Sequence, residues 1–150
     1  MKNIFDSSVV AELEGRINRL TANSIPQWGK MSVQQMLAHC CVTYEYIYEN
    51  KHPKPGAFKK FILKLFVKKI VVSETPYKKN SPTAPDFIIK DSRNFETEKN
   101  RLLGFIHKTQ ELGSAYFEYR RSHSFGTLTT NEWNNMFYKH LDHHLTQFGV

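Results

Sequence analysis

Apolar residues recur every three or four positions in four stretches of the chain, and this spacing places them on one face of an α-helix. Prolines, glycines and small polar residues are concentrated between these stretches. The pattern predicts long helices over about residues 7–21, 32–49, 95–112 and 130–148.

The ends of these helices carry sequence signals. Ser32 and Gln35 form a capping box, a pair of side chains that satisfies amide groups left unbonded at a helix N-terminus, and Thr129 and Glu132 form a second one. Gly113 suits the left-handed backbone conformation that often ends a helix. We therefore expect the second and fourth long helices to begin directly after Ser32 and Thr129, and the third to end at Gly113.

Two segments of different character lie between the second and third long helices. Residues 57–72 read AFKKFILKLFVKKIVV, in which Lys60, Lys64 and Lys68 recur every four positions and form a polar stripe on an otherwise apolar helix. Residues 73–92 contain three prolines and little periodicity, so we expect a long irregular connection of the kind that is often functional or lid-like. We find no convincing pair of strands.

This order of elements predicts an all-α protein, a four-helix bundle with a short accessory basic helix between the second and third long helices. A length of 150 residues favours one domain, 1–150, that can bury a sizeable core. The apolar runs are too short to span a bilayer. The first residues lack the apolar stretch and cleavage site of a secretion signal, so we expect a cytoplasmic protein.

The two cysteines are adjacent, and neighbouring side chains on a helix point about 100° apart, which disfavours a disulfide between them. We expect Cys40 and Cys41 to be free, buried thiols in a reducing compartment. A reactive thiol at Cys40, which follows His39, is the alternative.

The positive charge belongs to one part of the chain. The net charge is +7, and nine lysines lie in residues 51–79, where Glu74 is the only acid. A basic amphipathic helix can lie on a membrane surface, but a helix that covers a bundle needs the same apolar inner face and charged outer face. We favour the second interpretation and do not expect membrane contact. Nucleic-acid binding is not expected either, because we find no helix-turn-helix or aromatic stacking platform.

The last helix contains three of the seven histidines. On a helical wheel of about 100° per residue, Trp133, Phe137 and His144 all lie within about 60° of His140. His143 lies at the edge of this face. The wheel places a set of polar residues on the opposite side: Asn131, Asn135, Lys139, Asp142 and Thr146. We therefore expect His140 and His144 to be buried.

Two buried imidazoles four residues apart can bind one metal ion, as in helical H-x-x-x-H zinc sites. The alternative is a pair of core histidines that are hydrogen-bonded to other side chains or water, since each imidazole needs a partner once it is desolvated. We favour a divalent metal ion. His39, at the flank of the apolar stripe of the second helix, is a candidate third ligand, although a structural role at the helix edge fits its position equally well. His123, in the turn before the last helix, could also approach the site.

Three sequence stretches now resemble a known family: WGKMSVQQMLAHC, SPTAPDF and HSFGTLTTNEWNNMFYKHLDHHLTQFG. They resemble the DinB/YfiT-like superfamily of proposed metalloenzymes, in a branch catalogued as a domain of unknown function. The resemblance implies an up-down-down-up four-helix bundle with nickel or zinc at one end. It implies His39, His140 and His144 as the metal ligands. Relatives often form dimers, and some are thiol-dependent transferases or isomerases that use bacillithiol or mycothiol.

Three histidine ligands leave open coordination positions, which are typical of catalytic sites. We find no obvious general base, because Asp142 faces away and Glu45 lies on the polar side of its helix. Gln147, His123 and Tyr44 are candidates for orienting water or substrate. The absence of an acid–base partner favours activation of a thiol over hydrolysis.

These observations together predict a metal-dependent enzyme, a thiol S-transferase or a hydrolase, that acts on a small molecule. Its second substrate could be a low-molecular-weight thiol, and the enzyme could be a homodimer. The competing hypothesis is a non-catalytic, metal-stabilised bundle that serves in a stress response or in dimerisation.

Overall fold

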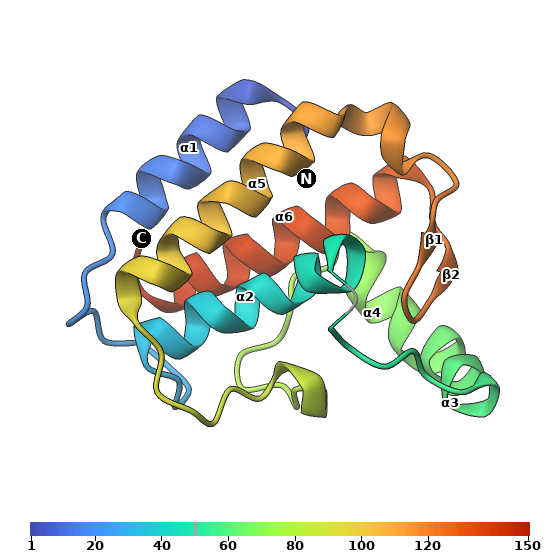
Figure 1. Cartoon of the computed structure of the whole chain (residues 1–150), viewed down its shortest axis with the longest axis horizontal. Coiled ribbons are helices and arrows are strands. Elements are labelled where there is room, and N and C mark those ends of the chain that lie inside the picture. The colour runs from blue at the N-terminus through green and yellow to red at the C-terminus, as the bar shows by residue number, and fades with distance from the viewer. Residues whose placement is uncertain (50) are drawn as a thin grey trace.

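A computed structural model describes residues 1–49 and 51–150, and helix is the predominant secondary structure, as the sequence predicts. Figure 1 shows the four long helices lying side by side. The long helices are α1 (Ser7–Asn18), α2 (Val33–Tyr48), α5 (Phe95–Phe117) and α6 (Thr130–Gln147). No helix in the described part of the chain is both long enough and apolar enough to cross a membrane.

The apolar faces of the four long helices meet in one core. Its centre is aromatic: the ring of Tyr44 stacks on Phe137 and Phe105 at centroid distances of 5.1 and 5.6 Å, and Trp133 stacks on Phe137 at 5.6 Å. Removal of such side chains from water stabilises the fold by about 1.5–3 kcal/mol each. The core therefore fixes the rotation of α2 and α6, the two helices that carry the candidate ligands.

Both predicted capping boxes are confirmed. The Ser32 hydroxyl accepts a hydrogen bond from the amide of Gln35, whose side chain accepts one from the Ser32 amide, and Thr129 and Glu132 are bonded in the same way. The first helix is shorter than predicted and ends at Asn18.

The prediction that the third long helix stops at Gly113 is confirmed in part. Gly113 has a non-helical backbone with positive φ (φ 71°, ψ 169°) and interrupts the helix there, but a further helical turn follows, so that α5 as a whole extends to Phe117. Phe117 is fully buried, and its ring packs against Phe5 and Trp133. Burial of this ring holds the last turn of α5 against the core after the kink.

A short pair of strands also lies where none was predicted. Strands β1 (Arg121–Ser122) and β2 (Gly126–Thr127) form an antiparallel hairpin before α6. The Ser122 hydroxyl closes the hairpin, since it donates to the carbonyl of Gly126 and accepts from the amide of Phe125, both at 2.9 Å. Two residues per strand give too short an alternation to be visible in a sequence.

The predicted accessory helix is built in three parts: α3 (Ala57–Ile62), a π-helical turn η1 (Leu63–Val67) and α4 (Lys68–Val72). The expectation that it buries an apolar inner face holds only for α4, where Val72 is buried and Val71 packs against the core, since no residue of α3 or η1 is buried. Only α4 packs closely on α6. The connection between α4 and α5 contains one 3₁₀ turn, η2 (Pro85–Phe87).

Polar groups attach α4 to α6. The amide of Asn135 donates to the carbonyl of Val72 at 2.9 Å, and the ammonium of Lys139 donates to the carbonyls of Ile70, at 2.8 Å, and Ser73. The wheel placed Asn135 and Lys139 on the solvent side of α6, and this is wrong: both are buried under the end of α4. Burial lowers the pKa of Lys139 to about 8.

Glu45 also departs from its predicted place on a polar helix side, because it is buried in an ionic contact between α2 and α5. Arg101 of α5 donates to Glu45 and, at 2.7 Å, to Glu98, and the ring of His52 lies 2.7 Å from the other oxygen of Glu45. Burial alone would raise the pKa of Glu45, but the hydrogen bonds from His52 and Arg101 outweigh it and hold that pKa below its usual value. The contact ties α2 to α5 beside the core.

The two cysteines are free and buried, as predicted. The thiol of Cys40 lies 3.8 Å from the sulfur of Met36, and that of Cys41 faces the carbonyl of Glu98. Burial raises the pKa of Cys40 far above its usual value and that of Cys41 to about 12. Both side chains therefore pack as neutral apolar groups.

We expect Glu45→Gln to lower the free energy of unfolding at pH 7 by about 1–3 kcal/mol, since Arg101 loses one of its charged partners. Folding lowers the pKa of Glu45, so the carboxylate stabilises the fold above a pH of about 4.5, which is its pKa in the unfolded chain. This stabilisation is lost as the pH falls through the pKa of Glu45 in the folded protein. The difference between wild type and variant should therefore shrink in acid. Denaturant unfolding at neutral and acidic pH measures it.

The control is Glu12→Gln, which removes an exposed ion pair with Lys2 and should leave the unfolding free energy unchanged. Equal effects of the two substitutions would contradict the role given to Glu45.

Candidate metal centre

Three histidines from two helices converge next to the core. His39 comes from α2, and His140 and His144 come from successive turns of α6; one ring nitrogen of each lies within 4.8 Å of the others. The Nε2 atoms of His39 and His140 are 2.9 Å apart. Two nitrogens bound to one ion at about 2.1 Å lie at a similar separation, so the rings are arranged as ligands of a common ion would be.

The other ring nitrogens have partners that determine the tautomers. Nδ1 of His39 donates to the backbone carbonyl of Phe87 at 2.9 Å, and Nδ1 of His144 donates to the amide oxygen of Gln147 at 2.8 Å. These oxygens only accept, so the proton of each ring is on Nδ1 and the lone pair is on Nε2. Metal-binding histidines are held in the same way by a partner behind the ring.

His140 has a more adaptable partner. Its Nδ1 lies 3.0 Å from the hydroxyl of Thr43, which can either donate or accept. Without an ion, His140 can donate from Nε2 to His39 while Thr43 donates to its Nδ1. With an ion, the hydroxyl can turn to accept from Nδ1. All three Nε2 lone pairs are then available, and the donor set fits a divalent ion that accepts nitrogen ligands.

The imidazoles are neutral near pH 7. Burial lowers the pKa of His39, burial and the neighbouring rings hold the pKa of His140 well below its usual value, and burial lowers the pKa of His144 to about 3. A metal ion that enters the cluster therefore displaces no proton from these rings near neutral pH.

Aromatic side chains surround the cluster, and two of them come from the 73–92 connection. The rings of Phe87 and Tyr77 pack edge-on against His140 at centroid distances of 5.9 and 6.5 Å, and Trp28 packs edge-on against His143 at 5.8 Å. His140 and His143 are partly exposed, which leaves the cluster open on this side.

The connection is also tied to α2. The hydroxyl of Tyr46 donates to Asp86 at 2.8 Å, and the side chain of Gln35 donates to the carbonyl of Ile89 at 3.2 Å. Together with the bond from His39 to Phe87, these contacts hold the 85–89 stretch across α2. The connection thus forms part of the wall of the site.

Gln147 joins the ligands to the loop before α2. Its side chain accepts from His144 and donates to the carbonyl of Trp28 at 2.7 Å. Gly29 lies against this amide: a Cβ at position 29 would be 2.6 Å from Nε2 of Gln147, and its φ of +83° disfavours any other residue. Gly29 therefore allows the close approach that keeps Gln147 behind His144.

The other residues singled out in the sequence have different surroundings. His123 stacks on Tyr46 at a centroid distance of 4.2 Å and is bonded to Ser124, and it is not among the clustered ligand atoms. Tyr44 lies in the aromatic core. His143 is half-buried at the rim, as the wheel predicts.

Sequence reasoning missed Thr43 and the Phe87 carbonyl. Thr43 follows His39 by four residues and so lies on the same face of α2, a spacing that could have identified it. The Phe87 carbonyl could not be identified from the sequence, because every residue has a backbone carbonyl.

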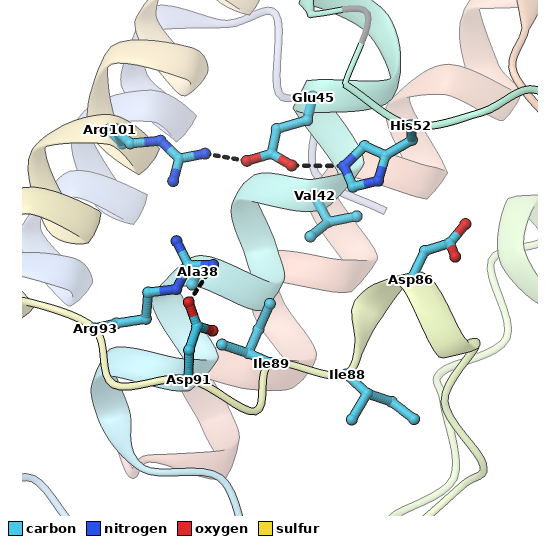
Figure 2. Close-up of a pocket in the computed structure, with 10 residues that line it drawn as sticks. All are labelled: Ala38, Val42, Glu45, His52, Asp86, Ile88, Ile89, Asp91, Arg93 and Arg101. Atoms are coloured by element: carbon cyan, nitrogen blue, oxygen red, sulfur yellow. Dashed lines mark hydrogen bonds and ion pairs between the residues drawn. The ribbon is translucent and has the colours of Figure 1, made fainter.

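A separate pocket of about 200 Å³ lies between α2 and the 85–93 stretch, and Figure 2 shows the residues that line it. Its charged groups are largely paired with one another: Arg101 and His52 both bind Glu45, and Arg93 binds Asp91 at 3.1 Å. We therefore interpret this pocket as part of the packing contact between α2 and its neighbours, which these ion pairs hold together.

Residues 8–149 match the family described as "Protein of unknown function (DUF1569)". No curated protein and no solved structure matches the chain.

We expect Gly29→Ala to weaken divalent metal binding by about 10- to 100-fold, because the new methyl group displaces Gln147 from His144. Competition with a chelator of known affinity measures the loss. Gly126→Ala is the matched control: Gly126 has a similar φ of +79° but open space at its Cβ position. Gly126→Ala should lower the free energy of unfolding by a similar amount and leave the metal affinity unchanged. A loss of affinity in both variants would attribute the effect to backbone strain.

Proposed function

The chain belongs to the DUF1569 family of proteins of unknown function, and we propose that it is a cytoplasmic metal-dependent enzyme. In this proposal His39, His140 and His144 bind one divalent ion, nickel or zinc. The enzyme activates a low-molecular-weight thiol or a water molecule for attack on a small molecule.

The observation that supports this proposal best is the hydrogen bonding behind the three rings. A carbonyl, a hydroxyl and an amide oxygen lie at the three Nδ1 atoms, and one ring nitrogen of each histidine lies within 4.8 Å of the others. Core histidines with purely structural roles need partners at both nitrogens. The Nε2 atoms of His39 and His140 are bonded to each other, whereas no hydrogen bond within the described part of the chain reaches Nε2 of His144.

A set of three protein ligands favours catalysis over a structural site, because structural zinc sites almost always have four. Among the described residues, no carboxylate or thiolate joins the three histidines. A divalent ion held there would stabilise a bound thiolate or hydroxide at neutral pH.

The surroundings favour a thiol over a hydrolytic water. A carboxylate or a second base would assist proton transfer in hydrolysis, and the carboxylates around the site are engaged: Asp142 binds Arg16 at 2.7 Å, and Asp86 accepts from Tyr46. A thiol that has lost its proton on binding needs no such base. Lys79, whose ammonium lies 4.2 Å above the ring of Trp28, places positive charge near the entrance and would favour an anionic small molecule.

The resemblance to the DinB/YfiT-like superfamily supports the same assignment, and with it the up-down-down-up bundle and a homodimer. The four long helices and the ligand positions on α2 and α6 are compatible with that topology. Two free cysteines fit a reducing cytoplasm.

The second candidate function is a metal-stabilised bundle without catalysis. It is favoured by the position of the cluster, which links α2, α6 and the 73–92 connection through His39 and its bond to Phe87. An ion there would stabilise the fold even if no reaction took place.

We expect purified protein to contain about one equivalent of nickel or zinc by elemental analysis. His140→Ala should lose most of it and should no longer be stabilised against heat by added metal. His143→Ala removes the neighbouring imidazole at the rim and should keep a full complement. Wild-type protein that binds neither metal, or a His140→Ala variant that keeps its metal, would overturn the site assignment.

We expect the metal-loaded protein to conjugate a thiol to 1-chloro-2,4-dinitrobenzene: the carbon–sulfur bond forms, chloride leaves, and the thiol proton passes to solvent. Bacillithiol, mycothiol, glutathione and cysteine should be compared, with His140→Ala as the background. Absorbance of the thioether product measures the rate. Tight metal binding without turnover for any thiol would favour the non-catalytic bundle.

A further inference from the structure

The accessory segment, residues 57–72, exposes large apolar side chains on a projecting part of the molecule. In Figure 1 α3 lies at one end, away from the four long helices. Large apolar side chains that are exposed together in one patch often mark an interaction site. Five of them are between 58% and 79% exposed: Phe58, Phe61, Leu65, Phe66 and Ile70.

The π-helical turn gathers these side chains on one side. In a straight α-helix Ile70 would lie about 120° around the axis from Phe58. The extra residue in the turn Leu63–Val67 rotates the residues of α4 back by about 100°. Ile70 then joins Phe58, Phe61 and Leu65 in one apolar stripe, to which α4 would otherwise contribute little.

Lysines flank this stripe. Lys59, Lys60, Lys64 and Lys69 have no carboxylate within ion-pair distance among the described residues, whereas Lys68 is paired with Glu132 at 2.7 Å. An open hollow of about 380 Å³ lies between the segment and Glu132 of α6 and is lined by Lys64, Lys68, Lys69, Val72, Ser73 and Glu132.

The segment packs on the bundle mainly through α4. Asn135 and Lys139 of α6 bind the carbonyls at the end of α4, and no residue of α3 or η1 is buried. The stripe is therefore free to contact a surface without disturbing the core or the histidine cluster.

We propose that the accessory segment binds the surface of an anionic lipid bilayer and so makes the protein peripherally membrane-associated. The phenylalanines and aliphatic side chains enter the boundary between headgroups and acyl chains, and the lysines remain at the level of the phosphates. Charge complementarity selects this occupant. A second copy of the chain would bring the same unpaired lysines to the same face, where like charges repel.

A bundle-covering helix, the role that the sequence favours for this segment, needs a buried inner face along its length, but in this segment only Val72 is buried. The inference is independent of metal binding and catalysis, since none of the hydrogen bonds of the cluster histidines involves a residue of the segment.

Flotation of the whole purified chain with vesicles tests this proposal, and circular dichroism checks that each variant is folded. Wild type should float with vesicles of phosphatidylglycerol and phosphatidylcholine, less so at physiological than at low salt, and should not float with phosphatidylcholine alone. Replacing Lys59, Lys60 and Lys64 together by Gln should weaken binding roughly a hundredfold. Phe61→Ser combined with Phe66→Ser should weaken it at least about tenfold.

Two controls match these changes in charge and in apolar exposure. One replaces Lys30, Lys78 and Lys90 by Gln, and the other combines Ile25→Ser with Tyr119→Ser, whose side chains are exposed outside the segment. Both should bind like wild type. In a Phe66→Trp variant, anionic vesicles should shift the added tryptophan fluorescence to shorter wavelength.

Absence of flotation with anionic vesicles at low salt would overturn the proposal. So would equal losses in the segment variants and in the controls. Sedimentation velocity without lipid identifies the main rival: a dimer that is abolished by the Phe61→Ser and Phe66→Ser pair, in a protein that does not float, would assign the stripe to a second copy of the chain.

Discussion

The packing of three imidazoles, two buried and one partly exposed, into one small space is the constraint on which most of this structure depends. A desolvated imidazole needs a partner at each nitrogen, and here every Nδ1 has one from a different element: the 3₁₀ turn, α2 and the last turn of α6. Gln147 also donates a hydrogen bond to the carbonyl of Trp28, so the loop before α2 is held against the same cluster. The histidines thus determine the course of two connections that have little secondary structure of their own.

Part of this site could be predicted from the sequence because it is encoded by local periodicity. His140 and His144 share a face with Trp133 and Phe137, and four residues on one helix keep their relation whatever surrounds them. His39 could be assigned as a ligand only through the family resemblance, since its position at the flank of the apolar stripe fits a structural role equally well. The Phe87 carbonyl could not be predicted, because it lies 48 residues from His39 in a segment without a repeating pattern.

The errors have a common physical cause. A helical wheel assumes that each helix has one buried side, yet α6 also lies under α4 and α2 also faces Arg101 of α5. Asn135, Lys139 and Glu45 are therefore buried on sides that the wheel assigned to water, each with a polar partner. Conversely, the accessory segment has the amphipathic pattern of a covering helix but no core beneath α3.

The two buried cysteines have a consequence for the sulfur chemistry of the protein. Both thiols are held protonated, out of contact with solvent, one against Met36 and the other against a backbone carbonyl. They cannot serve as an internal nucleophile, compete for a soft metal, or be the first groups lost to oxidation. Any reaction through sulfur at this centre must therefore receive its sulfur from a diffusible molecule, and its rate will depend on the redox state of that external pool rather than on that of the protein.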